Sequence, residues 1–295
     1  MALPNGIQST QELLDAHAHI WNHIFSFINS MSLKCAIQLR IPDIIHKHQK
    51  PNTLSELIDA LPNINKSKSD CVERLMRILI HSKFFTKVKI SKDENKNKEG
   101  YWLTPSSHLL IKDEPMNVTS FVLAMLDPVL TDPFHHIGEW FKNDDPTPFV
   151  TIHGRTFWEQ TEQDLRLNRL FNEGLANDTW FVASVILKDC RHVFEGLKSM
   201  VGVAGGTGTM ARAITDAFPG LKYCSVLERP NVVAGLDGTE KLTFIAGDIF
   251  ESIPPADAIF MKWIFDSFHD EECIKLLKEC EKQSPAKTKE EVDYS

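Results

Sequence analysis

Apolar side chains recur every three or four residues near the start of the chain and predict a helical region over residues 10–50. One stripe at this spacing consists of Ile20, Ile24, Ile28 and Met31. A stripe of large apolar groups fits either of two roles, a face turned to the protein core or an interface between subunits. The spacing alone leaves both roles open.

Shorter elements follow and are typical of a winged helix. Thr53 and Glu56 form a capping-box pattern that predicts a short helix ending at Leu61, and a second helix is predicted over residues 71–82. Two short strands, FFTKVKI and YWLT, are predicted on either side of the charged turn DENKNKEG. Many winged helices bind DNA, but an outline of this kind does not assign a function.

The chain reads as mainly helical over residues 104–196, and from about residue 197 short apolar runs alternate with helical segments. The strand-like runs are SMVGVA, YCSVL, KLTFIAG and ADAIFMKWIF, with the helical segment ARAITDAF after the first. This alternation predicts an α/β fold with a parallel sheet and crossover helices. The last stretch, residues 281–295, is polar and aperiodic, which predicts a disordered tail.

Composition narrows the function classes. The 295 residues carry a formal net charge of -8, which argues against a general affinity for nucleic acid or for an anionic membrane. No apolar run is long enough to cross a bilayer, and the start does not resemble a secretory signal. The six cysteines are scattered without a CxxC pair, so we expect reduced thiols, a cytoplasmic protein and no metal site.

A glycine-rich loop, Val201-Gly202-Val203-Ala204-Gly205-Gly206-Thr207-Gly208, lies between the first strand of the alternating region and its helix. Glycines let the backbone turn tightly and let a ligand approach the main chain. Many nucleotide-binding folds use such a loop, and some tight turns of this kind bind nothing. The loop therefore needs support from other residues.

That support comes from the ends of the next three strands. Glu228 ends the second strand, Asp248 and Ile249 follow the third, and Lys262 ends the fourth. An acid in the position of Glu228 can accept hydrogen bonds from both ribose hydroxyls, and Asp248 can accept from an adenine amino group. Because open α/β sheets bind ligands at the carboxyl ends of their strands, the four positions together predict a ligand site.

Besides the glycine loop, the chain carries a series of longer motifs: NHIFSFINSMSLKCAIQLRIPDII, RLMRILIHS, LAMLDPVL, NDDPTPF, FNEGLAND, RPNVVAGL, GDIFESIPPADAIFMKW and DEECIKLLK. They resemble the segments of the plant small-molecule O-methyltransferases that act on phenylpropanoids, stilbenes and isoflavonoids, with the resveratrol-type and isoflavone-type enzymes nearest. The resemblance covers roughly residues 8–280 and is specific because its motifs occur in series.

The resemblance implies an organisation and a reaction. It implies a winged-helix dimerisation domain over residues 1–110, a helical linker and acceptor-pocket region over 111–196, a partial Rossmann-like domain over 197–280 and a polar tail over 281–295. The implied cofactor is S-adenosylmethionine, the acceptor is a small phenol, and the protein is a homodimer. The implied cofactor residues are Ala204, Gly205, Gly206, Glu228, Asp248, Ile249 and Lys262, and the implied acceptor residues are Met125, Asp127, Trp158, Phe171 and Leu175.

The sequence departs from the family pattern at the glycine-rich loop and at the position of the family's catalytic base. Gly202 stands where the family has aspartate, Ala204 where it has glycine, and Glu228 where it has a shorter acid, so we expect weaker cofactor binding. Asp266 stands where the family has its catalytic histidine, and a carboxylate is a much weaker proton acceptor than an imidazole. His269, three residues on and on roughly the same helical face, is a weak alternative base.

The family chain continues beyond the segment that matches Lys278, so we expect a shortened sheet with strand order 3-2-1-4 and impaired activity. An alternative is a non-catalytic subunit that dimerises with an intact relative. DNA binding is disfavoured because the second predicted helix offers only Arg74 and Arg77 as cations. A nicotinamide-dependent oxidoreductase is disfavoured because the motifs after the loop follow the methyltransferase series.

Overall fold

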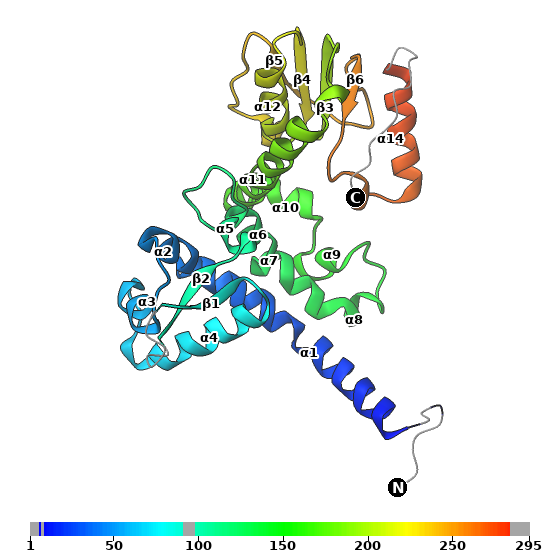
Figure 1. The fold of residues 1–295 in the computed structure, drawn as a ribbon. Helices are drawn as coiled ribbons and strands as arrows, with labels where there is room; N and C mark the ends of the chain where they lie inside the picture. Colours follow the sequence, from blue (N-terminus) through cyan, green and yellow to red (C-terminus); the bar gives the residue numbers. More distant parts are fainter. Residues whose placement is uncertain (1–5, 7–8, 91–97, 284–295) are drawn as a thin grey trace. The chain divides into compact units, whose positions relative to one another are not determined.

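The computed structural model describes residues 6, 9–90 and 98–283 and divides into two compact units, Met1–Pro128 and Val129–Ser295 (Figure 1). Most of the predicted charged turn and residues 284–295 of the predicted tail lie outside the described residues. Residues 281–283, which the sequence assigns to the tail, instead form the end of the last helix, α14, at Gln283.

The first unit is helical with a two-stranded antiparallel sheet. Its elements are α1 (Thr10–Gln38), α2 (Ile41–His48), α3 (Leu54–Ala60), η1 (Lys66–Lys68), α4 (Ser69–His81), β1 (Phe85–Lys89), β2 (Glu99–Leu103), α5 (Pro105–His108) and α6 (Thr119–Met125). The predicted capping box is confirmed: the Thr53 hydroxyl accepts from the Glu56 amide, and the Glu56 carboxylate accepts from the Thr53 amide at 2.8 Å. The helical region predicted over residues 10–50 breaks at Arg40, whose left-handed backbone (φ 59°) separates α1 from α2.

The apolar stripe of α1 does not face the core of its unit. Ile20 and Ile24 are both 56% exposed in this single chain, whereas Ala36, near the end of the helix, is fully buried. A core role for the stripe is therefore wrong over the first part of α1. The interface role remains.

The second unit is built on a four-stranded parallel sheet. Before the sheet come α7 (Pro128–Thr131), η2 (Asp132–His136), α8 (Ile137–Trp140), α9 (Pro148–His153), α10 (Phe157–Gln163), α11 (Leu165–Asp189) and η3 (Arg191–Val193). The sheet region comprises β3 (Ser199–Val203), α12 (Thr209–Ala217), β4 (Tyr223–Glu228), α13 (Pro230–Val233), β5 (Leu242–Ala246), β6 (Ala258–Phe260), η4 (Phe265–Ser267) and α14 (Asp270–Gln283). The order β5-β4-β3-β6 confirms the predicted 3-2-1-4.

Both faces of this sheet are covered by helices, as parallel sheets require. Alternate residues of a strand point to opposite faces, so Met200 packs with α11 and α12 while Val201 packs with α14. Figure 1 shows α12 and α14 beside the strands. The apolar runs seen in the sequence thus form strands that pack against helices on both faces of the sheet. This packing holds the strand ends in register.

Candidate functional site

The loop between β3 and α12 requires glycine at specific positions. Gly208 has φ 80°, and a Cβ there would lie 2.8 Å from the Phe244 ring. A Cβ on Gly205 would lie 3.0 Å from Val226 Cγ1 and 3.2 Å from the Gly202 carbonyl oxygen. The loop therefore packs its backbone directly on the neighbouring strands β4 and β5.

Ala204 adopts the left-handed conformation that glycine favours, with φ 47°. In this region the Cβ of a non-glycine residue crowds the following carbonyl, at a cost of roughly 1–2 kcal/mol. The resemblance expects glycine here, and the backbone has kept a glycine-like geometry around the alanine. Backbone strain of this kind is common at ligand sites.

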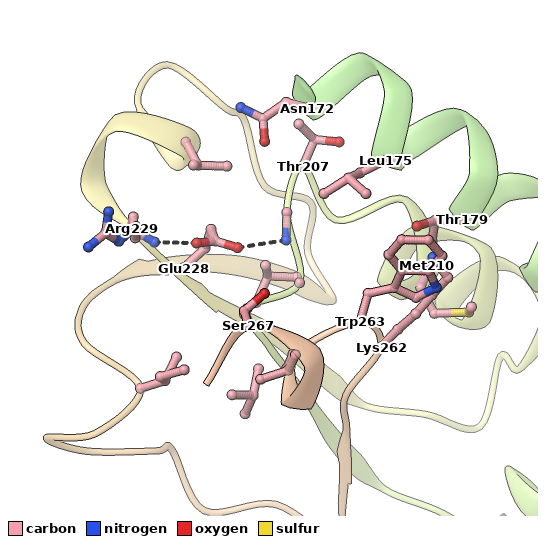
Figure 2. A pocket seen from close by; sticks show the side chains of 18 of the residues that line it. Asn172, Leu175, Thr179, Thr207, Met210, Glu228, Arg229, Lys262, Trp263 and Ser267 are labelled. Carbon is pink, nitrogen blue, oxygen red and sulfur yellow. Dashed lines mark hydrogen bonds between the residues drawn. The ribbon is translucent and has the colours of Figure 1, made fainter. Parts of the chain in front are cut away.

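Glu228 is a partly buried carboxylate at the end of β4, as the sequence predicts. Its Oε2 accepts from the Gly206 amide at 2.9 Å, and its Oε1 accepts from the Arg229 amide at 2.8 Å (Figure 2). Burial raises the pKa of Glu228, and the two amide hydrogen bonds and the Arg229 charge partly oppose this rise. Each oxygen still has a lone pair for a further donor.

The third and fourth strand ends supply two more polar groups, both two residues later than the strand itself. β5 ends at Ala246, and Asp248 then accepts from the Phe250 amide at 2.8 Å. β6 ends at Phe260, and Lys262 pairs with Asp178 on α11, with Nζ 2.6 Å from Oδ2.

These groups line one pocket of about 540 Å³ in the second unit (Figure 2). All seven residues predicted for the cofactor line it: Ala204, Gly205, Gly206, Glu228, Asp248, Ile249 and Lys262. Asp266 and three of the predicted acceptor residues, Trp158, Phe171 and Leu175, line it as well. The pocket thus joins a polar wall at the strand ends to an aromatic wall from α10 and α11.

Three predicted residues are not among those that line it. Met125 ends α6 in the first unit and Asp127 follows it, so their part in an acceptor pocket stays a prediction. His269 lies outside the lining, with its backbone amide donating to Glu272. The expectation that it shares a helical face with Asp266 is wrong, because Asp266 belongs to η4 and the extended backbone of Phe268 ends that turn before α14 begins.

The sequence did not predict the ion pairs that hold the two cationic side chains of the pocket, Arg229 and Lys262, in place. Arg229 pairs with Glu162 on α10 at 3.4 Å, and its guanidinium lies 5.4 Å from the centre of the Trp158 ring. Arg229 was visible in the sequence as the first residue of the segment RPNVVAGL, directly after Glu228. Asp178 closes the segment FNEGLAND, but nothing in the sequence indicated its pairing with Lys262, which lies 84 residues away.

Comparisons with known proteins place this geometry in a family. Residues 134–290 match a family model described as an O-methyltransferase domain, and residues 21–113 match an O-methyltransferase dimerisation domain. The chain belongs to the O-methyltransferase family. It is 58% identical over 285 residues to 8-hydroxyquercetin 8-O-methyltransferase of Mentha piperita, covering 95% of this chain and 77% of that protein. It is 53% identical to trans-resveratrol di-O-methyltransferase of Vitis vinifera, covering 97% of this chain and 79% of that protein.

Solved structures show the same fold. Human N-acetylserotonin methyltransferase in complex with SAM aligns with a TM-score of 0.71 at 17% identity, over 96% of this chain and 79% of that one. CalO1, a methyltransferase in calicheamicin biosynthesis, aligns in its SAH-bound form with a TM-score of 0.72 at 22% identity, over 95% and 79%. The O-methyltransferase chain is thus an S-adenosylmethionine-dependent enzyme by family.

The pocket residues fit this cofactor. Glu228 is a partly buried carboxylate with two acceptor positions left, which suits a ribose, and the close packing of Gly205 and Gly208 leaves the loop backbone facing the pocket. Among the described residues, no group of three or more His, Cys, Asp or Glu side chains could hold a metal ion. Over the same residues, no helix is long and apolar enough to span a membrane.

Proposed function

We propose that this O-methyltransferase acts on the hydroxyl of a small plant phenol, with S-adenosylmethionine bound at the loop and strand ends. Two relatives are named for a flavonoid and for resveratrol, both of which are phenolic. The observation that carries the proposal is the single pocket that combines the strand-end acids with Trp158 and Phe171. Flat aromatic walls suit a planar phenol, because offset and edge-on ring contacts are favourable.

We assign the cofactor residues by their place in the pocket. Glu228 would accept from the ribose hydroxyls, Asp248 from the adenine amino group, and Ile249 would pack on the base. Ala204, Gly205 and Gly206 would present their backbone to the cofactor, and Lys262 would line the same pocket. When bound, S-adenosylmethionine supplies an electrophilic methyl group.

The residue at the position of the general base determines the rate of methyl transfer that we expect. Asp266 lines the pocket where the family has histidine, and it would have to take the proton of the phenolic hydroxyl. A positioned general base typically contributes roughly 10²–10⁴-fold, and a carboxylate is poorly matched to a phenol. We therefore expect methyl transfer at or near background.

Dimerisation through α1 is the second part of the proposal. Its exposed apolar residues are Leu14, Ile20, Trp21, Ile24, Phe25, Phe27 and Met31. Monomeric proteins rarely expose so many large apolar groups on one element. The matched dimerisation domain, residues 21–113, includes most of them. The same surface supports the alternative of a non-catalytic subunit that pairs with an intact relative.

None of the six cysteines takes part in a disulfide, and we propose a cytoplasmic location on that ground.

The deciding experiment is mass spectrometry of the purified protein with methyl-labelled S-adenosylmethionine and a panel of flavonoids, stilbenes and phenylpropanoids. A labelled product at low rate supports the enzyme. Turnover at a rate typical of an intact enzyme contradicts impaired activity. Binding of the cofactor with no product from any phenol favours the non-catalytic subunit.

A further inference from the structure

The pocket holds two cations, and a carboxylate neutralises each of them. Lys262 pairs with Asp178 at 2.6 Å, and Arg229 pairs with Glu162 at 3.4 Å. Asp178 is not itself part of the pocket lining; it acts from α11 through Lys262.

Three carboxylates of the lining are not neutralised in this way. Glu228, Asp248 and Asp266 have no ion-pair partner within 4 Å in the part of the chain that the structure describes. Glu228 and Asp248 accept backbone amides instead, and Arg229 acts on Glu228 only at longer range. With both cations paired, the lining carries an excess of negative charge.

We propose that Asp178 is a positioning residue that balances the charge of Lys262, and that it thereby raises the affinity of the pocket for the sulfonium cation of S-adenosylmethionine relative to the uncharged sulfur of its demethylated product. The two ligands differ in this one charge and share their other polar groups. The proposal rests on the binding of S-adenosylmethionine in this pocket.

The two ion pairs differ in how strongly water screens them. The side chains of Lys262 and Asp178 are 15% and 16% exposed, whereas those of Arg229 and Glu162 are 43% and 50% exposed. Buried charges act over longer distances because less solvent screens them. Breaking the Lys262 pair therefore changes the field in the pocket more than breaking the Arg229 pair.

The size of the effect follows from Coulomb's law. For a sulfonium bound about 10 Å from Lys262, an unpaired unit charge at an effective dielectric constant of about 20 to 40 would change its binding by roughly 4- to 16-fold. The uncharged product is unaffected by this contribution. The ratio of the two dissociation constants isolates it from any change in packing, which would weaken both ligands alike.

The test is calorimetric titration of the full chain with S-adenosylmethionine and, separately, with S-adenosylhomocysteine. In Asp178→Asn, Lys262 is left unpaired, and the affinity ratio shifts about 4- to 16-fold against the cation. In Lys262→Met, Asp178 is left unpaired, and the ratio shifts in the opposite direction. The double variant restores the wild-type ratio, and it also serves if Asp178→Asn does not fold, since a buried pair is often replaced by neutral groups without loss of stability.

Glu162→Gln is the matched control, and its ratio should stay within about twofold of wild type because that pair is solvent-screened. Equal weakening of both ligands in Asp178→Asn and Lys262→Met, with no change in their ratio, would overturn the proposal and leave the pair a structural role. If the wild-type protein is folded but binds neither ligand, the cofactor assignment fails, and this inference fails with it.

Discussion

Glu228→Gln tests the assignment of the pocket most directly. Glutamine keeps the length of the side chain but replaces one acceptor oxygen with an amide group that only donates. In the structure the two carboxylate oxygens already accept the amides of Gly206 and Arg229. One acceptor position remains on each oxygen, which matches two ribose hydroxyls.

The expected loss follows from this count. The amide oxygen of glutamine can replace one carboxylate oxygen, but its NH₂ group would face a backbone N–H and a hydroxyl with nothing to accept them. A hydrogen bond to a charged group contributes about 1.5–3 kcal/mol, so losing one weakens binding about 10- to 150-fold. Glu162→Gln makes the same chemical change at another residue of the lining, and there we expect less than about a threefold change because water screens the pair of Glu162 with Arg229.

The pH dependence gives a second signature. Burial raises the pKa of Glu228, so the carboxylate takes up a proton at a higher pH than an ordinary glutamate. Binding of S-adenosylhomocysteine should weaken as pH falls through this raised pKa. The contribution of Glu228 to the free energy of unfolding has the opposite pH dependence. Because the pKa of Glu228 is higher in the folded protein than in the unfolded chain, this stabilisation is present at low pH and is lost as pH rises through the folded pKa. Glu228→Gln removes both dependences.

Calorimetric titration with S-adenosylhomocysteine, repeated between about pH 4.5 and 8, measures the affinity, and urea unfolding over the same range measures the stability. If Glu228→Gln binds within twofold of wild type at pH 7.5 and keeps the wild-type pH profile, Glu228 does not hold the ligand. The ribose assignment would then be refuted.

Three further changes test the base, the loop and the interface. Asp266→His alone should raise methyl transfer to a phenol only slightly in a labelled-product assay, because a general base also needs a partner that orients it, whereas Asp266→Asn should leave it at background. Gly208→Ala combines left-handed backbone with a Cβ 2.8 Å from an aromatic ring and should destabilise the fold by about 2–4 kcal/mol in urea unfolding. Gly206→Ala, which has a left-handed φ of 56° but open space, should lose only about 1 kcal/mol. Ile24→Asp should convert a dimer into a monomer in sedimentation, and Ile274→Asp, at a similarly exposed isoleucine of α14, should not.

Each of these has a clear contrary outcome. Equal rates for the two Asp266 variants would mean that this position does not host the base. Equal destabilisation by the Gly206 and Gly208 variants would mean that the contact between the added Cβ at position 208 and the Phe244 ring does not lower stability. A wild-type chain that sediments as a monomer at micromolar concentration would remove the interface role of α1.

The sequence by itself determined the parts of this protein that local patterns encode. The capping box at Thr53 is formed by residues three apart, and the parallel sheet follows from apolar runs that alternate with helices. The order of the four strands was predicted from the resemblance to the family, and the place of Glu228 at a strand end from the apolar run that it closes. The family followed from motifs in series.

Only the tertiary structure decided which side chains meet and which backbone is strained. Asp178 and Lys262 are 84 residues apart, and no periodicity relates positions on α11 to the turn after β6. The exposure of Ile20 and Ile24 depends on what packs beside α1, which a helical stripe does not record. Ala204 keeps a left-handed backbone because the close contacts of Gly205 and its neighbours on the strands fix the loop, so the geometry was set by packing rather than by the residue that occupies it.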